Sequence, residues 1–302
     1  MVKIYFGFKP QQIFTRAKRS GEFKNLVFEN NIFSMQTIKR LVVKFGTASL
    51  LNGGTTLDRE IFSRVARQIA ALRLQGIEII IVSSGAVAAG REELAKLGLN
   101  PSKISKKVLA GAGAMPLLRR WSEAFKPYKI PIGQVWVTYR NWCDKGERAS
   151  IATTISESLL AGIVPVINEN DVVSQTEILS MEAGLSDNDW LAAKIAWLIN
   201  ADAIIFFSDA GAVFEANPET VANARRYREI NAWDIPLSLR TSPDKSKTGR
   251  GGIKSKLMAA ASCSKKGMRV SIASLNGDHS IVRFAMGENV GTMMGTRNIL
   301  CE

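Results

Sequence analysis

Residues 77–90 read Ile-Glu-Ile-Ile-Ile-Val-Ser-Ser-Gly-Ala-Val-Ala-Ala-Gly, and this stretch decides the fold class. Its continuous apolar run, Ile79–Val82, is typical of a strand that is buried on both faces. The serines and the glycine that follow predict a tight turn, and the alanine-rich sequence after them predicts a helix from Ala86 to Leu97. A buried strand that turns directly into a helix is the repeating unit of a parallel α/β sheet.

The same alternation continues along the chain from Arg40 onward. Apolar, β-branched runs predict further strands at residues 41–43, 132–137, 163–167, 203–207 and 270–273. Apolar residues at helical spacing predict helices at residues 57–75, 104–126, 144–161, 187–199 and 253–266. We therefore expect an α/β fold, a three-layer αβα sandwich with a mostly parallel central sheet. Ligands of such sheets bind beyond the carboxyl ends of the strands.

The N-terminal segment, residues 1–34, differs from the rest of the chain. It is basic, carries several Phe and Ile residues, and shows no strand–helix rhythm. Arg16, Lys18, Arg19 and low acidity suit a targeting peptide, whereas the scarcity of serine and alanine speaks against one. We predict a non-essential or poorly ordered extension, with a functional start at Met35 and one domain over residues 35–302.

The composition narrows the class of protein. Of the 302 residues 46% are apolar and 22% charged, an ordinary globular balance. No apolar run reaches the ~18–20 residues of a membrane span, so we expect no membrane partner. The net charge of +13 suits nucleic acid, an anionic membrane or a polyanionic small molecule such as ATP, and charge alone does not choose between them.

Cysteine and histidine usage argues against several kinds of site. Cys143, Cys263 and Cys301 lie far apart without a Cys-x-x-Cys pair, which disfavours a disulfide framework or a zinc site and favours a reducing, cytoplasmic compartment. The single histidine, His279, disfavours histidine metal clusters and a Ser-His-Asp hydrolase. We expect His279 to be a polar residue near a helix start.

Two basic motifs suit a phosphate group, although the chain has neither a Walker-type loop nor a Gly-x-Gly-x-x-Gly after its first strand. Lys44 ends the first predicted strand, just before an expected Gly-Thr turn at residues 46–47, and Gly46 lets backbone amides approach an anion. Residues 248–256, Thr-Gly-Arg-Gly-Gly-Ile-Lys-Ser-Lys, lead into a helix and suit a nucleotide triphosphate. A solvated strand-end lysine and a disordered basic loop are the structural alternatives.

Polar segments follow three further strands. The turn at residues 83–85 can receive a carboxylate or phosphate at a helix N-terminus, or can simply be a tight crossover. Residues 168–171, Asn-Glu-Asn-Asp, can cap turns or hold an ammonium group, as Asp171 would for an amino acid. Residues 187–189, Asp-Asn-Asp, open a helix, and helix capping explains one of the three. Ser208 and Asp209 end another strand.

Together these segments resemble the amino-acid kinase superfamily and, within it, the glutamate 5-kinases. The matching pieces are residues 42–47, 83–90, 165–171, 187–189 and 249–256, in family order from about Lys39 to Thr296. The resemblance implies the amino-acid kinase fold over residues 35–302. It also implies ATP-dependent phosphorylation of the γ-carboxylate of L-glutamate to L-glutamyl 5-phosphate, the first step of proline biosynthesis.

The resemblance also implies residue roles. Lys44 and Lys256 would neutralise charge on the transferred phosphoryl group, and Asp189 would hold both lysines. Glutamate would be bound by Ser84, Gly85, Asn168, Asp171 and Asn188. ATP would be bound by Lys44, Ser208, Asp209, Arg250, Gly251, Gly252, Ile253, Lys254, Ser255 and Lys256. Mg²⁺ would bridge the ATP phosphates without a protein ligand. No general base is needed, because a carboxylate is already a nucleophile.

Departures from the family pattern bear on acceptor choice and feedback inhibition. Arg250 replaces a threonine, Ser186 and Ala212 replace glycines, Ala114 replaces a glutamine, and residues 172–186 are longer than typical. The chain ends soon after residue 296, so we do not expect the PUA domain of many bacterial members. Family likeness implies a dimer or tetramer, proline as a feedback inhibitor, and a glutamyl phosphate reductase as partner.

Two other functions stay open at this point. A related kinase could act on another acidic amino acid or a small phosphate, which the departures in residues 172–186 motivate. A basic RNA-binding protein with a degenerate kinase fold is motivated by the net charge of +13. The scattered Phe and Trp residues build no stacking platform, so a nucleic-acid partner is not favoured.

Overall fold

The computed structural model describes residues 38–174, 188–216, 218, 220–221, 223–240, 253–275 and 279–295. The predicted extension over residues 1–34 lies outside the described residues, as do Ser186 and most of the segment 172–186. Arg250, Gly251 and Gly252 also lie outside them.

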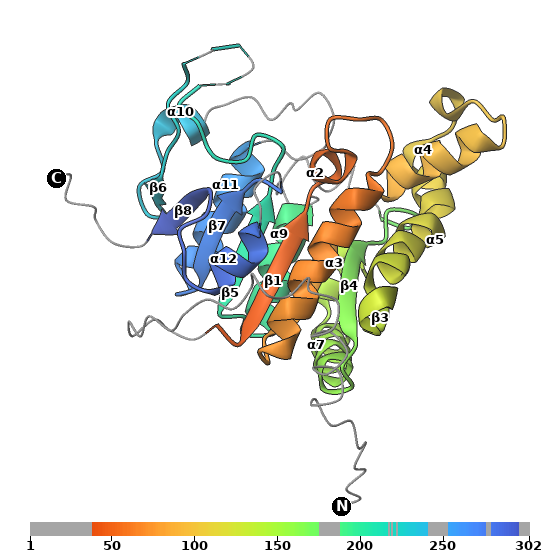
Figure 1. Cartoon of the computed structure of the whole chain (residues 1–302), viewed down its shortest axis with the longest axis horizontal. Helices are drawn as coiled ribbons and strands as arrows, with labels where there is room; N and C mark the ends of the chain where they lie inside the picture. Colours follow the sequence, from red (N-terminus) through yellow and green to blue (C-terminus); the bar gives the residue numbers. More distant parts are fainter. Residues whose placement is uncertain are drawn as a thin grey trace, which may run out of the picture. The chain divides into compact units, whose positions relative to one another are not determined.

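An eight-stranded sheet forms the centre of the described chain, with the order β3-β4-β2-β1-β5-β7-β8-β6 (Figure 1). Its strands are β1 (Arg40–Phe45), β2 (Glu78–Ser83), β3 (Ile132–Val137), β4 (Val164–Glu169), β5 (Ala203–Phe207), β6 (Glu229–Asn231), β7 (Arg269–Ala273) and β8 (Thr292–Gly295). The six strands from β3 to β7 in this order pair in parallel, and β8 is antiparallel to β7. The predicted α/β fold with a mostly parallel sheet is confirmed.

The helices lie between the strands, as the sequence pattern predicts. The longer ones are α3 (Arg59–Leu74), α4 (Ala86–Lys96), α5 (Lys106–Phe125), α7 (Lys145–Leu160), α9 (Asn188–Leu198) and α11 (Ile253–Ser264). The shorter ones are α2 (Thr47–Leu51), α6 (Tyr139–Cys143), α10 (Leu237–Arg240) and α12 (Ser280–Ala285). In the part of the chain that the structure describes, no helix is both long and apolar enough to cross a membrane.

The central strand β1 has a different helical layer on each face. Val42 belongs to the core that α9 and α11 cover, together with Ala193 and Leu257. Phe45 packs on the opposite face, where its ring lies 5.3 Å from that of Trp121 on α5. Side chains alternate along a strand, so Lys44 shares the face of Val42 and points toward α9 and α11. This parity sets the position of the site described below.

The structure contains short elements that apolar periodicity does not indicate. After β1 we expected a Gly-Thr turn, but Gly46 is the N-cap of the five-residue helix α2. A single helical turn has too few residues for a periodic pattern, which is why the prediction was wrong. The short strands β6 and β8 escaped prediction for the same reason. His279 is the N-cap residue of α12, so its expected place at a helix start is confirmed.

Helices α4 and α5 cross with their backbones in contact, at two glycines. A Cβ atom on Gly113 would lie 1.8 Å from the carbonyl oxygen of Ala86, and one on Gly90 would lie 1.9 Å from that of Leu109. Only hydrogen side chains allow this approach. The crossing fixes the first turn of α4, which directly follows the small-residue turn after β2.

We predict that Gly113→Ala lowers the free energy of unfolding by about 2 kcal/mol or more, because the added methyl group forces two backbones apart. Equilibrium unfolding in urea measures this change. Gly111→Ala on the same helix is the matched control, since its Cβ would meet Val172 Cγ2 at 3.4 Å. Alanine favours a helix interior, so the control should be neutral or slightly stabilising. Equal effects of the two substitutions would contradict the close crossing.

Candidate active site

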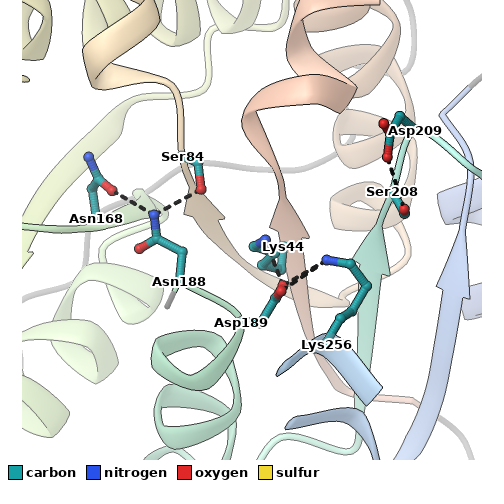
Figure 2. A network of polar contacts seen from close by, with 8 residues as sticks. All are labelled: Lys44, Ser84, Asn168, Asn188, Asp189, Ser208, Asp209 and Lys256. Carbon is teal, nitrogen blue, oxygen red and sulfur yellow. Dashed lines mark hydrogen bonds and ion pairs between the residues drawn. The ribbon is translucent and has the colours of Figure 1, made fainter. Parts of the chain in front are cut away.

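The polar motifs after the strands come together at the carboxyl ends of β1, β2 and β4 and at the first turn of α9. Figure 2 shows two neighbouring groups of side chains there. One group is charged and consists of Lys44, Asp189 and Lys256, which we call the lysine cluster. The other is uncharged and consists of Ser84, Asn168 and Asn188, which we call the amide cluster.

The lysine cluster is an ion triad that three distant parts of the sequence supply. Lys44 Nζ lies 2.6 Å from Asp189 Oδ1. Lys256 Nζ donates to both carboxylate oxygens of Asp189, at 2.9 and 3.0 Å. All three are buried, with exposed fractions of 3% for Lys44, 1% for Asp189 and 7% for Lys256. Buried charges are tolerated only when they are paired and hydrogen-bonded, and each lysine meets this condition through Asp189.

The charge balance of this cluster favours an anion. Burial by itself would raise the pKa of Asp189, but the ammonium groups of Lys256 and Lys44 outweigh it and lower this pKa from 3.8 to about 2. Asp189 is therefore ionised at neutral pH. Counted over these three buried side chains, two ammonium groups and one carboxylate sum to a charge of +1. A phosphoryl group entering this region would be attracted strongly.

Gly46 keeps space open beside the Lys44 ammonium group. A Cβ atom at position 46 would lie 3.7 Å from Lys44 Nζ and 3.9 Å from Ser49 Oγ on α2. The Ser49 hydroxyl is buried and has no hydrogen-bond partner. The glycine after the strand-end lysine thus leaves room for a group that contacts the ammonium from the α2 side.

The amide cluster lies next to the lysine cluster, because Asn188 and Asp189 are consecutive residues at the start of α9. Asn188 Nδ2 donates to Ser84 Oγ at 2.8 Å and to Asn168 Oδ1 at 3.5 Å. The other amide atom, Asn188 Oδ1, is buried without a hydrogen-bond partner. A buried acceptor without a partner is costly, which suggests that a ligand donates to it.

The remaining predicted residues lie around these two clusters. Gly85 follows Ser84 with φ +111°, a conformation that glycine adopts easily, and its own Cβ position is surrounded by Leu50, Leu57 and Leu117. Asp171 is half-buried in the turn after β4. Ser208 Oγ donates to Asp209 Oδ1 at 3.2 Å at the end of β5, apart from the other labelled side chains in Figure 2.

The predicted basic loop is described only from its helical end. Ile253, Lys254 and Ser255 form the start of α11, directly before Lys256. Lys254 is exposed, whereas the hydroxyl of Ser255 is buried without a hydrogen-bond partner. Arg250, Gly251 and Gly252 precede this helix outside the described residues, so their assignment to ATP stays a prediction.

Sequence reasoning missed a cavity further along α9. This shallow hollow is lined by Val137, Thr138, Tyr139, Trp142, Glu169, Leu191 and Lys194. Lys194 Nζ lies 5.2 Å from the ring centroid of Tyr139 and 5.4 Å from that of Trp142. Burial lowers the pKa of Lys194. A lysine among the apolar residues that follow the first turn of α9 was the available signal. Among the described residues, no group of three or more His, Cys, Asp or Glu side chains could hold a metal ion.

The sequence profile of the amino acid kinase family matches residues 39–274, which include both clusters. The chain belongs to the amino acid kinase family. It is 37% identical over 259 residues to the glutamate 5-kinase of Shewanella amazonensis, a match that covers 86% of this chain and 67% of the relative. It is 36% identical over 260 residues to the glutamate 5-kinase of Burkholderia lata, with 86% and 68% covered.

Two solved structures share the fold of this amino acid kinase. The UMP kinase of Bacillus anthracis superimposes with a TM-score of 0.58 at 16% identity, covering 87% of this chain and 98% of that one. The isopentenyl phosphate kinase of T. acidophilum superimposes with a TM-score of 0.55 at 14% identity, covering 85% and 100%. At such low identity the likeness concerns the fold.

We predict that Asp189→Asn lowers the free energy of unfolding by about 3–5 kcal/mol at pH 7, because it leaves two buried ammonium groups without their counter-charge. The pKa of Asp189 is about 2 in the folded chain and 3.8 without its surroundings. A lowered carboxyl pKa stabilises the fold fully above about pH 4, and this contribution is lost as the pH falls toward 2. The difference in the free energy of unfolding between wild type and Asp189→Asn should therefore shrink as the pH falls from about 4 toward 2.

Urea unfolding at a series of pH values measures this difference. Asp144→Asn is the matched control, since Asp144 caps α7 and asparagine caps a helix about as well. The control should stay close to wild type at every pH. An Asp189→Asn variant as stable as wild type at pH 7 would contradict the electrostatic account.

Proposed function

We propose that this amino acid kinase transfers the γ-phosphoryl group of ATP to the γ-carboxylate of L-glutamate, giving L-glutamyl 5-phosphate and ADP. The observation that carries the proposal is that two different clusters meet at consecutive residues, Asn188 and Asp189, on the first turn of α9. The lysine cluster suits the transferred phosphoryl group, and the adjacent amide cluster suits a small polar acceptor. The shared name of the relatives, glutamate 5-kinase, favours glutamate among the acceptors considered from the sequence.

Charge neutralisation is the task of the lysine cluster. Lys44 and Lys256 approach the phosphoryl group from β1 and α11, and Asp189 holds both ammonium groups 2.6–3.0 Å from its own oxygens. Phosphoryl transfer depends on positioning and on stabilising charge that spreads over the phosphoryl oxygens. Two cations fixed before the nucleotide arrives need little reorganisation during the reaction.

The bond changes need no proton transfer. One γ-carboxylate oxygen of glutamate attacks the γ-phosphorus of ATP, and the bond from that phosphorus to the bridging oxygen of ADP breaks. The products are a mixed acyl-phosphate anhydride and ADP. Because the attacking oxygen is already ionised at neutral pH, the site requires no general base.

Acceptor binding is assigned to the amide cluster and its neighbours. Asn188 Oδ1, which is buried without a hydrogen-bond partner, accepts from the ammonium group of the substrate. Asp171 supplies the opposite charge from the turn after β4. Ser84 and Gly85 lie at the start of α4, where a helix N-terminus favours a carboxylate. Asn168 orients Asn188 from the end of β4.

The nucleotide would enter as its magnesium complex, in which Mg²⁺ belongs to the substrate and would offset charge on the phosphates. We assign Ser208 and Asp209, together with residues 250–256, to the nucleotide. The product is a labile acyl phosphate, so a glutamyl phosphate reductase that consumes it directly is the proposed partner. Proline as feedback inhibitor, a dimer or tetramer, and a cytoplasmic location complete the proposal.

We predict that the purified chain releases ADP from Mg²⁺–ATP only when glutamate is present, and that hydroxylamine traps the product as a hydroxamate. Lys44→Ala should lower kcat by ~10²-fold or more, the usual effect of losing a group that stabilises charge in the transition state. Lys103→Ala, at an exposed position between α4 and α5, is the control and should keep full activity. Full turnover by the Lys44 variant would contradict the role of this lysine, and ADP release without glutamate would contradict the substrate.

A further inference from the structure

A chain of buried hydrogen bonds connects α5 to Ser84 from behind the amide cluster. Trp121 Nε1 donates to Ser83 Oγ at 3.1 Å, and Ser83 Oγ donates to the carbonyl oxygen of Ser84 at 2.9 Å. Ser84 Oγ in turn accepts from Asn188 at 2.8 Å. Trp121 and Ser83 are both fully buried. Neither of them belongs to the two clusters, and Trp121 is 38 residues away from Ser83 in the sequence.

One face of α5 supports the whole turn after β2. Gly113, Leu117 and Trp121 lie four residues apart and therefore on the same side of this helix. Gly113 packs against the backbone of Ala86, the Leu117 side chain lies beside Gly85, and Trp121 donates a hydrogen bond to Ser83. The residues on both sides of Ser84 are thus fixed by consecutive turns of one helix.

The orientation of the indole ring is itself fixed by packing. Its centroid lies 4.6 Å from the ring of Phe62 on α3 and 5.3 Å from the ring of Phe45 on β1. The Ser84 amide donates to the carbonyl oxygen of Phe45 at 3.0 Å, so the same packed group also holds the backbone of the turn. A buried indole N–H needs an acceptor, and here the acceptor is the residue next to Ser84.

We propose that Trp121 is a positioning residue for the acceptor: through Ser83 it fixes the peptide that carries the Ser84 hydroxyl. This inference rests on the proposed function, which assigns Ser84 to glutamate. When the N–H group is lost, Ser83 Oγ loses its donor and can rotate away from Ser84. The Ser84 hydroxyl then samples positions in which it no longer meets the substrate, while the lysine cluster on the opposite face of β1 is unchanged.

Trp121→Phe removes the N–H group and keeps an aromatic ring in the core. We expect the KM for glutamate to rise by about five-fold, the equivalent of one net hydrogen bond. The KM for ATP should stay unchanged, and kcat should stay within about two-fold. Ser83→Ala should have the same effect, and the double variant should be no worse than either single one, because both break one chain of bonds. Ser83→Thr keeps the hydroxyl and should retain the wild-type KM.

A core control separates positioning from stability. Phe125→Leu removes a fully buried ring 6.3 Å from the indole without touching its N–H group. It should lower the urea midpoint and leave the KM for glutamate unchanged. The inference is overturned if Trp121→Phe leaves the KM for glutamate unchanged, if it raises both KM values equally, or if Phe125→Leu raises the KM for glutamate as much. Should Trp121→Phe fail to fold, the Ser83 variants decide alone.

These outcomes are distinguishable from a failure of the proposed function. A wild-type chain without glutamate-dependent ADP release would refute the function itself. A wild-type chain that phosphorylates glutamate, with variants that do not shift the KM for glutamate, would refute only the role of Trp121.

Discussion

A single carboxylate, Asp189, is held between two lysines in the interior of this kinase, and the arrangement of the surrounding elements depends on it. The two ammonium groups come from β1 and α11, and the carboxylate from α9. Each charge would be unstable at this depth without the others. The fold must therefore bring the central strand and two helices together at one point, where two of the three charged side chains are positive. The same arrangement that pairs the buried charges is the one that the proposed function assigns to the phosphoryl group.

The start of α9 joins the two halves of the site. Asn188 and Asp189 are neighbours in sequence, and one turns toward Ser84 while the other turns toward Lys44 and Lys256. In the proposed function, this one rigid element brings the acceptor and the phosphoryl donor close together. Reactions between two bound substrates gain most from this kind of fixed proximity.

The sequence predicted the parallel sheet and its larger helices well, because continuous apolar strands and helical spacing are strong signals. It also indicated the polar segments at the strand ends. What it did not indicate was which of them meet. That Lys44 faces α9 and Phe45 faces α5 follows from strand parity only once the layers are known. The hydrogen bond from Trp121 to Ser83 joins residues with no common pattern, and helix α2 is too short for periodicity. Arg250, Gly251 and Gly252 lie outside the described residues, so their part in the site is still argued from the sequence.

The division of the site has a consequence for how acceptor preference can change. In the proposed function, the acceptor half takes Ser84 from the turn after β2 and Asn168 from the end of β4, whereas the phosphoryl half takes its lysines from β1 and α11. New side chains at these two strand ends would alter selectivity and leave the two lysines in place. A modular layout of this kind suits a scaffold that is to be re-engineered for a different carboxylic acid.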